Sequence, residues 1–213
     1  MLRPREGTPV DFAFTPEQVR LQQRCRQLAA AFVARSFEHD RDATHPAENY
    51  QRLRQEGFLA LTIGKEWGGL GFGFLDHTIA YEALGQGCPS TALAFNMHAS
   101  VVMPVIQSPE VGWKAKRHLA DLVVQKGKLI GGNFSEPTTT ALIGERPLNV
   151  RARKVNGGYR ITGRKMFASM LEAADYVVVL CYPEEATNPT AGIMLMIPPD
   201  APGRRVNPNW DVL

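Results

Sequence analysis

A change of residue pattern near position 127 constrains the fold of this 213-residue chain more than any other feature. Before that point, apolar residues recur at helical spacing, as at Val19, Leu21, Leu28, Phe32 and Val33. After it, apolar and polar residues alternate over 148–155 and again over 159–163, which is typical of strands. We therefore expect a two-domain α+β fold, with an all-α helical bundle over residues 1–127 and a β domain over residues 128–213.

Helix start and stop residues divide the first domain. Thr15 precedes Pro16, a pairing that favours a helix start, and the first helix is expected to run to about residue 37. Pro46 opens a second helix that ends before Gly57, a residue type common just past a helix. Five glycines in residues 64–73 predict a loop. Three further helices are expected, over residues 74–84, 90–106 and 109–125.

The β domain is predicted from one hairpin and two apolar runs. Asn156-Gly157-Gly158 supplies the hairpin turn, and the runs 176–181 and 193–197 are expected to be central strands. Only 16 residues follow the last run, which leaves four or five strands with open edges. We therefore expect an incomplete antiparallel β-barrel and a further segment that covers it.

Composition excludes several classes of protein. Hydrophobic residues make up 44% and charged residues 21% of the chain, which is an ordinary globular balance. The 24 basic and 21 acidic residues are mixed, so no surface for nucleic acid is predicted. No signal peptide and no apolar run of about 18 residues is present. Three scattered cysteines predict neither a disulfide framework nor a zinc site, and His77, His98 and His118 lack ligand spacing. We expect a cytoplasmic chain without a membrane partner.

Several short sequence words, weak singly but strong in this order and spacing, resemble those of the acyl-CoA dehydrogenases. They extend over nearly the whole chain: Glu66–Gly71, Tyr81–Gly85, Ser135–Pro137, the hairpin at 157–159 and Gly163–Ser169. In that family a helical bundle, a small β-barrel and a second helical bundle form one chain of nearly twice this length. FAD lies between the barrel and the last bundle. The resemblance implies that only the first two parts are present here.

The resemblance also implies which residues would contact FAD. They are Phe134, Ser135, Thr140, Phe167, Ala168 and Ser169, with Ala141 on the substrate side. Ser135 stands where relatives usually have threonine, and a fixed donor there favours the reduced flavin. From the residues alone, Ser135 could equally cap a turn, and Phe167 could pack in the barrel core. Residues 138–142 depart from the family's glycine-rich loop, which places that loop and its substrate serine in doubt.

The family's catalytic glutamate belongs to the second helical bundle, and no residue here matches it, so no catalytic residue is assigned. The resemblance implies an FAD-dependent enzyme that oxidises the Cα–Cβ bond of an acyl-CoA thioester, although this chain alone is expected to be inactive. An external acceptor such as an electron-transfer flavoprotein would take the electrons, and the complete enzyme would be a homodimer or homotetramer. Two alternatives stay open: a two-component flavin monooxygenase of the same fold, and a non-catalytic fragment or half of a split protein.

Overall fold

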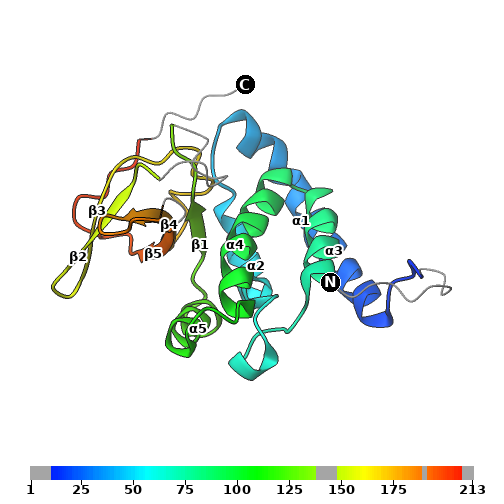
Figure 1. Ribbon diagram of the computed structural model, residues 1–213. Coiled ribbons are helices and arrows are strands. Elements are labelled where there is room, and N and C mark those ends of the chain that lie inside the picture. The colour runs from blue at the N-terminus through cyan, green and yellow to red at the C-terminus, as the bar shows by residue number, and fades with distance from the viewer. Residues whose placement is uncertain (1–10, 138–147, 189–190, 208–213) are drawn as a thin grey trace.

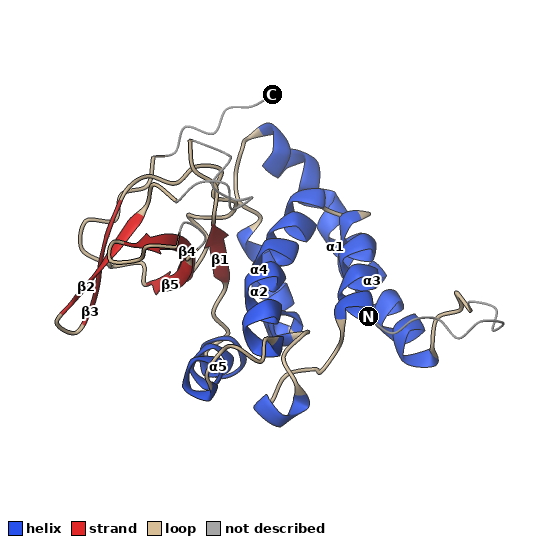
Figure 2. Ribbon diagram, in the orientation of Figure 1, coloured by secondary structure: helices blue, strands red, loops and turns tan. Residues whose placement is uncertain are grey.

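A computed structural model describes residues 11–137, 148–188 and 191–207 of the chain. The helices lie on one side of the molecule and the strands on the other (Figures 1 and 2). Two short 3-10 turns, Phe58–Ala60 and Lys65–Trp67, lie between α2 and α3, and a π-helical turn, Asp121–Gln125, continues α5. The helices are α1 (Pro16–Arg41), α2 (Ala47–Gln55), α3 (Phe74–Gly85), α4 (Pro89–Gln107) and α5 (Trp113–Ala120).

The five described strands form one mixed sheet that does not close into a barrel. They are β1 (Ile130–Asn133), β2 (Arg151–Val155), β3 (Gly158–Thr162), β4 (Tyr176–Pro183) and β5 (Ile193–Ile197). The order is β1-β4-β2-β3, and β5, which is off this path, pairs with β4 in antiparallel orientation. The α+β class and the β2–β3 hairpin are as predicted. The sheet is open, as expected of an incomplete barrel, but it is mixed rather than antiparallel throughout, because β4 pairs in parallel with both β1 and β2.

Strand β1 was not predicted, and its pairing explains the mixed sheet. It has four residues, two of them glycine and only one, Ile130, β-branched, so no alternation of apolar and polar residues marks it in the sequence. The register places Ile130 beside Tyr176 and Asn133 beside Val179, far along the chain. Residues 129–133 become a strand because β4 offers them a hydrogen-bonding edge, which is a tertiary effect.

Helix α1 follows the predicted start signals closely. Thr15 Oγ1 accepts from the Gln18 N–H at 3.2 Å, and Gln18 Oε1 accepts from the Thr15 N–H at 3.0 Å, which makes a capping box. The buried stripe differs from the one predicted, since Val19 and Val33 are exposed. It recurs every three or four residues, as expected for one face of a helix, and consists of Leu21, Cys25, Leu28, Ala29 and Phe32.

The helices and the sheet share one hydrophobic core. Val178 of β4 and Ile130 of β1 belong to the same buried cluster as Phe95 and Val101 of α4. On the opposite face of the sheet, Val177, Val179 and Cys181 pack in a second cluster. Both faces of β4 are therefore covered, which explains why the run 176–181 is almost continuously apolar.

His98 of α4 ties the helices to the sheet. Its imidazole is 1% exposed and lies between two backbone groups. The Ile130 N–H donates to Nδ1 at 2.9 Å, so the ring proton sits on Nε2, which donates to the Leu59 carbonyl at 2.9 Å. Burial lowers the pKa of His98 to about 4. The ring is thus a neutral cross-link among α4, β1 and the turn after α2.

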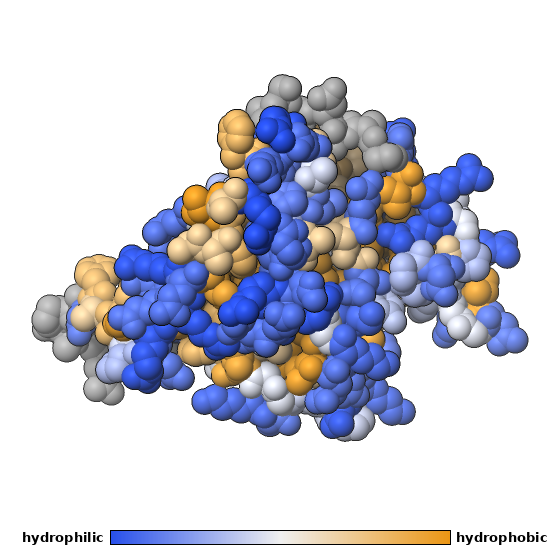
Figure 3. Space-filling model, turned by 180° about the vertical axis from the view of Figure 1, so that it is seen from behind, coloured by the Kyte–Doolittle hydropathy of each residue, from blue (hydrophilic) through white to orange (hydrophobic). Residues whose placement is uncertain are grey.

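Exposed apolar side chains are spread over several elements. Phe37 is on α1, Phe74 on α3 and Trp113 on α5. The face seen in Figure 3 is mostly hydrophilic, and its hydrophobic patches are separated from one another. Among the described helices, none has the length and apolar character needed to cross a membrane.

Candidate functional site

Two segments that are 30 residues apart in sequence meet at the end of β1. The first, Phe134–Pro137, leaves β1, and the second, Gly163–Ser169, leaves β3. The Met166 N–H donates to the Ser135 carbonyl at 3.0 Å, and Lys165 Nζ donates to the Phe134 carbonyl at 3.0 Å. The structure therefore brings together the two segments that contain most of the predicted cofactor contacts.

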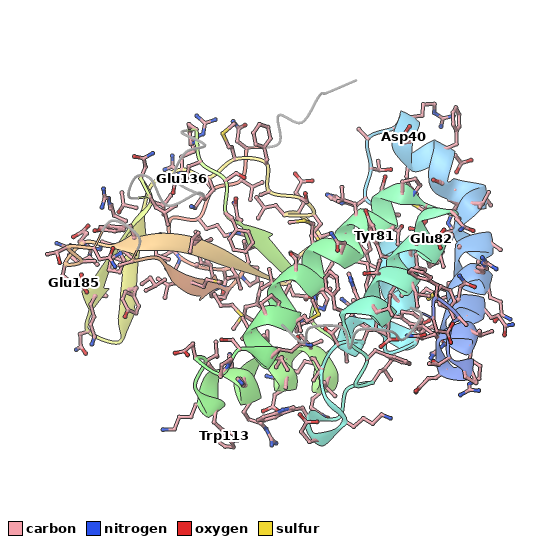
Figure 4. All side chains as sticks on the ribbon, turned by 45° about the vertical axis from the view of Figure 1, so that its right-hand side comes forward. Asp40, Tyr81, Glu82, Trp113, Glu136 and Glu185 are labelled. Carbon is pink, nitrogen blue, oxygen red and sulfur yellow. The ribbon has the colours of Figure 1, made fainter. Side chains whose placement is uncertain are left out.

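A buried ion pair lies beneath this junction. Lys165 Nζ is 2.7 Å from Glu136 Oε1, and the two side chains are 5% and 0% exposed. The Glu136 carboxylate also accepts from the N–H groups of Asn149 at 2.6 Å and Val150 at 3.1 Å. Figure 4 shows Glu136 on the sheet side of the molecule. The pair thus joins three segments: the exit of β1, the entry to β2 and the exit of β3.

The electrostatics of the pair follow from its burial and its donors. Burial raises the pKa of Glu136, but Lys165 and the two backbone N–H groups outweigh it, so the net pKa is lowered. The nearby Cys181 thiol is buried as well, and burial raises its pKa to about 11. Glu136 is therefore an ionised structural carboxylate, and Cys181 is an unreactive thiol.

The second segment holds an aromatic ring outside the core. Phe167 is 60% exposed, in a loop rather than a strand, so it does not pack in the barrel core. Its φ of 55° lies in the left-handed region, which is rare for a bulky residue and costs on the order of 1–3 kcal/mol. Such strain is common where a side chain must face a ligand. The position of Phe167 thus favours a surface role for its ring.

Met170 anchors the loop that carries Phe167. It also has a positive φ, 51°, but it is buried. Its Cε lies 3.9 Å from the place a Cβ would take on Gly131, and the Ala174 Cβ lies 3.2 Å from that place. The missing side chain at Gly131 therefore lets residues 170–174 pack directly on β1.

Three polar groups near this junction have no hydrogen-bond partner among the described residues. The hydroxyls of Ser135 and Ser169, both half-buried, have no hydrogen-bond partner among the described residues. The same is true of the buried Asn133 Oδ1, one residue before Phe134. Buried polar atoms normally have partners, so these groups are available to a ligand. Ser135 does not cap a turn through its hydroxyl.

The remaining predicted site residues divide into two groups. Phe134 and Ala168 are half-buried within the two segments. Thr140 and Ala141 lie outside the described residues. Sequence reasoning missed the Glu136–Lys165 pair and Asn133. The sequence hinted at this ion pair only through one charged residue in each of two family-like motifs, Ser135–Pro137 and Gly163–Ser169. That the two residues pair depends on the fold.

The carboxylates of the other matching words lie elsewhere. Glu82 of α3 accepts a hydrogen bond from Gln86 Nε2 at 2.6 Å, and Glu66 is exposed in the 3-10 turn Lys65–Trp67. In Figure 4, Tyr81 and Glu82 are well separated from Glu136. Among the described residues, no cluster of His, Cys, Asp and Glu could hold a metal ion.

Comparison with known proteins agrees with this architecture. The sequence profile of the acyl-CoA dehydrogenase N-terminal domain matches residues 15–110. YdbM of Bacillus subtilis (strain 168), an acyl-CoA dehydrogenase by name, is 30% identical over 203 residues, which are 95% of this chain and 52% of YdbM. This chain is a relative of the acyl-CoA dehydrogenases. The matched residues include helices α1 to α4.

Proteins whose names describe other activities are similar to this chain over nearly the same residues. The amino sugar nitrososynthase DnmZ of Streptomyces peucetius is 32% identical over 202 residues, covering 92% of this chain and 48% of DnmZ. The FMN-bound crystal structure of TdsC from Paenibacillus sp. A11-2 superimposes with a TM-score of 0.76 at 26% identity, covering 90% of this chain and 47% of TdsC. The chain spans about half the length of the relatives it matches.

Proposed function

We propose that this chain is the flavin-binding part of an FAD-dependent oxidoreductase that dehydrogenates an acyl-CoA thioester. The observation that carries the proposal is the junction at the end of β1, where the segment of Ser135, whose hydroxyl has no partner among the described residues, contacts the segment of the exposed Phe167. A flavin bound there would supply the hydride acceptor. The dehydrogenase name of YdbM and the matching family profile support the reaction class.

The residues of this surface have the properties that a flavin ring requires. The hydroxyls of Ser135 and Ser169 and the backbone N–H of Ser135 can all donate hydrogen bonds to the edge of the flavin ring. The ring-edge acceptor atoms gain electron density when the flavin is reduced. Phe167 offers an aromatic face for stacking and excludes water from one side. Phe134 and Ala168 belong to the same two segments. Thr140 and Ala141, which the resemblance places near the cofactor and the substrate, complete the proposed set.

The proton-abstracting group is not proposed among the described residues. Glu136 is buried and ionised, and both of its oxygens already accept hydrogen bonds, so it cannot accept a proton from a substrate carbon. We therefore propose that dehydrogenation needs residues beyond this chain, and that the chain alone is inactive. The proposed partners are an acyl-CoA substrate, an external acceptor such as an electron-transfer flavoprotein, and further copies in a dimer or tetramer. A cytoplasmic location fits these partners.

A flavin titration tests the proposal. The purified chain is expected to bind about one FAD per chain, with a shifted flavin absorbance spectrum. Replacing both hydroxyls, as Ser135→Ala and Ser169→Ala together, should weaken binding by about ten- to a hundredfold, since each lost hydrogen bond costs about 1 kcal/mol or more. Ser36→Ala on α1, on the helical side of the molecule, is the matched control and should bind FAD like the wild type. Equal FAD binding by all three proteins would refute the assignment.

A second candidate is a two-component flavin monooxygenase of the same fold. One observation favours it: the similarity at 26% identity to TdsC, which is named as a dibenzothiophene monooxygenase. Absence of the family's glycine-rich motif from residues 138–142 agrees with it.

One experiment separates the two functions. It uses the flavin-loaded protein mixed with any second half that the neighbouring gene encodes. Bleaching of the flavin by CoA thioesters supports dehydrogenation, and oxygen uptake with reduced flavin supports monooxygenation.

The experiment with the second half also tests the non-catalytic alternative. If the chain is half of a split protein, it should form a complex with that product and gain flavin affinity. If it is a remnant, neither mixing nor flavin addition should change it. Uptake of FAD by the chain, alone or in the complex, therefore separates a flavin-binding role from an assembly role.

A further inference from the structure

The backbone of Ser135 is held on both sides by hydrogen bonds. The preceding carbonyl, that of Phe134, accepts from Lys165 Nζ at 3.0 Å, and its own carbonyl accepts from the Met166 N–H at 3.0 Å. A trans peptide unit is planar, with its C=O and N–H pointing in opposite directions. The Phe134 carbonyl faces the buried Lys165 ammonium, so the Ser135 N–H of the same unit points away from it. Lys165 therefore sets the direction of that N–H group.

Lys165 can do this only because Glu136 compensates its charge. An ammonium that is 5% exposed would be strongly destabilised without a partner. Glu136 lies 2.7 Å away and is itself fixed by the N–H groups of Asn149 and Val150. The ammonium is thus placed by atoms of three chain segments, and it has little freedom to move.

We propose that Lys165 is a positioning residue for flavin, acting through the Phe134–Ser135 peptide rather than by touching the cofactor. The inference rests on the proposed flavin function and adds to it a residue that controls the flavin's redox balance. A donor that is already aimed at the ring edge needs no reorganisation when electron density rises there. Lys165 should therefore increase both the affinity for FAD and the preference for reduced over oxidised flavin.

Three variants separate positioning from folding. Lys165→Met alone leaves the buried Glu136 carboxylate without its partner and should be strongly destabilised. The double variant Glu136→Gln with Lys165→Met removes both charges, so it should fold, but the Phe134 carbonyl still lacks its donor. Lys128→Met is the control, because Lys128 pairs with Asp175 at 2.8 Å and both residues lie outside the segments Phe134–Pro137 and Gly163–Ser169. Urea unfolding, FAD titration and the midpoint potential of bound FAD are measured for each.

The double variant is expected to unfold at a urea concentration close to that of the wild type. Its affinity for FAD should fall about tenfold, and its preference for reduced flavin should fall by a similar factor, which is about 30 mV for a two-electron couple. The Lys128→Met variant should keep the wild-type affinity and potential. A double variant that is unfolded, or that is folded and binds FAD with wild-type affinity and potential, overturns the proposal. If the wild type takes up no FAD, the proposed function itself fails, and this inference fails with it.

Discussion

Replacing His98 with leucine should destabilise the protein at neutral pH. The change leaves the Ile130 N–H and the Leu59 carbonyl buried without partners, each of which now bonds the imidazole at 2.9 Å. An unsatisfied buried polar group costs about 1–3 kcal/mol, so the two together should cost about 2–6 kcal/mol. The leucine fills most of the ring's volume, so the loss measures mainly the hydrogen bonds.

The same variant should reduce the pH dependence of stability. The pKa of His98 is about 4 in the folded protein and about 6.5 when unfolded, so the unfolded chain binds more protons between these values. This contribution is fully present above about pH 6.5 and is lost as the pH falls toward 4. Between pH 7.5 and pH 5 it amounts to about 2 kcal/mol. His77, whose pKa burial also lowers, is unchanged in both proteins.

Urea unfolding followed by tryptophan fluorescence at pH 7.5 and pH 5 measures both effects. The wild type should lose about 2 kcal/mol more than His98→Leu between the two pH values. His118→Leu, at an exposed position on α5, is the control and should behave like the wild type. A His98→Leu protein that keeps the full wild-type pH dependence would show that this imidazole is not the neutral cross-link described above.

Three further predictions concern the helices and the sheet. Thr15→Ala removes the capping box of α1 and should cost about 1 kcal/mol in thermal or urea unfolding, whereas Thr187→Ala, an exposed loop change, should cost much less. Gly69→Ala would drive a Cβ into the Ile63 carbonyl and should cost about 1–3 kcal/mol or more, while Gly158→Ala meets no atom within 4 Å and should be nearly neutral. Asn133→Leu removes an unpaired buried oxygen and should raise the stability of the flavin-free chain by about 1 kcal/mol; a loss of stability would contradict the unpaired state.

Most helices could be predicted because their signals are local. Thr15 caps α1 and Pro16 is its first residue, as the residue types suggest. Gly57, with its φ of 76°, follows the C-cap of α2, also as its residue type suggests. The last helix was predicted to begin at residue 109 and begins at Trp113 instead. Gly112 there has an extended conformation, and propensity alone does not locate such a boundary.

The candidate site was predictable only in part. The words around Ser135 and Phe167 identified two segments, and the structure places them in contact. Exposure of the Phe167 ring and its positive φ have no local signal in the sequence. Pairing of Glu136 with Lys165 also depends on three segments meeting.

Local sequence patterns were enough to predict the order of helices before strands, the start of α1, the β2–β3 hairpin and the family relationship, because each depends on neighbouring residues or on short motifs. The folded chain was needed to find that β1 is a strand, that the sheet is mixed, and that Lys165 donates to the Phe134 carbonyl. These features need groups that are distant in sequence to meet, and hydrogen bonding and burial become decisive only when the chain is folded.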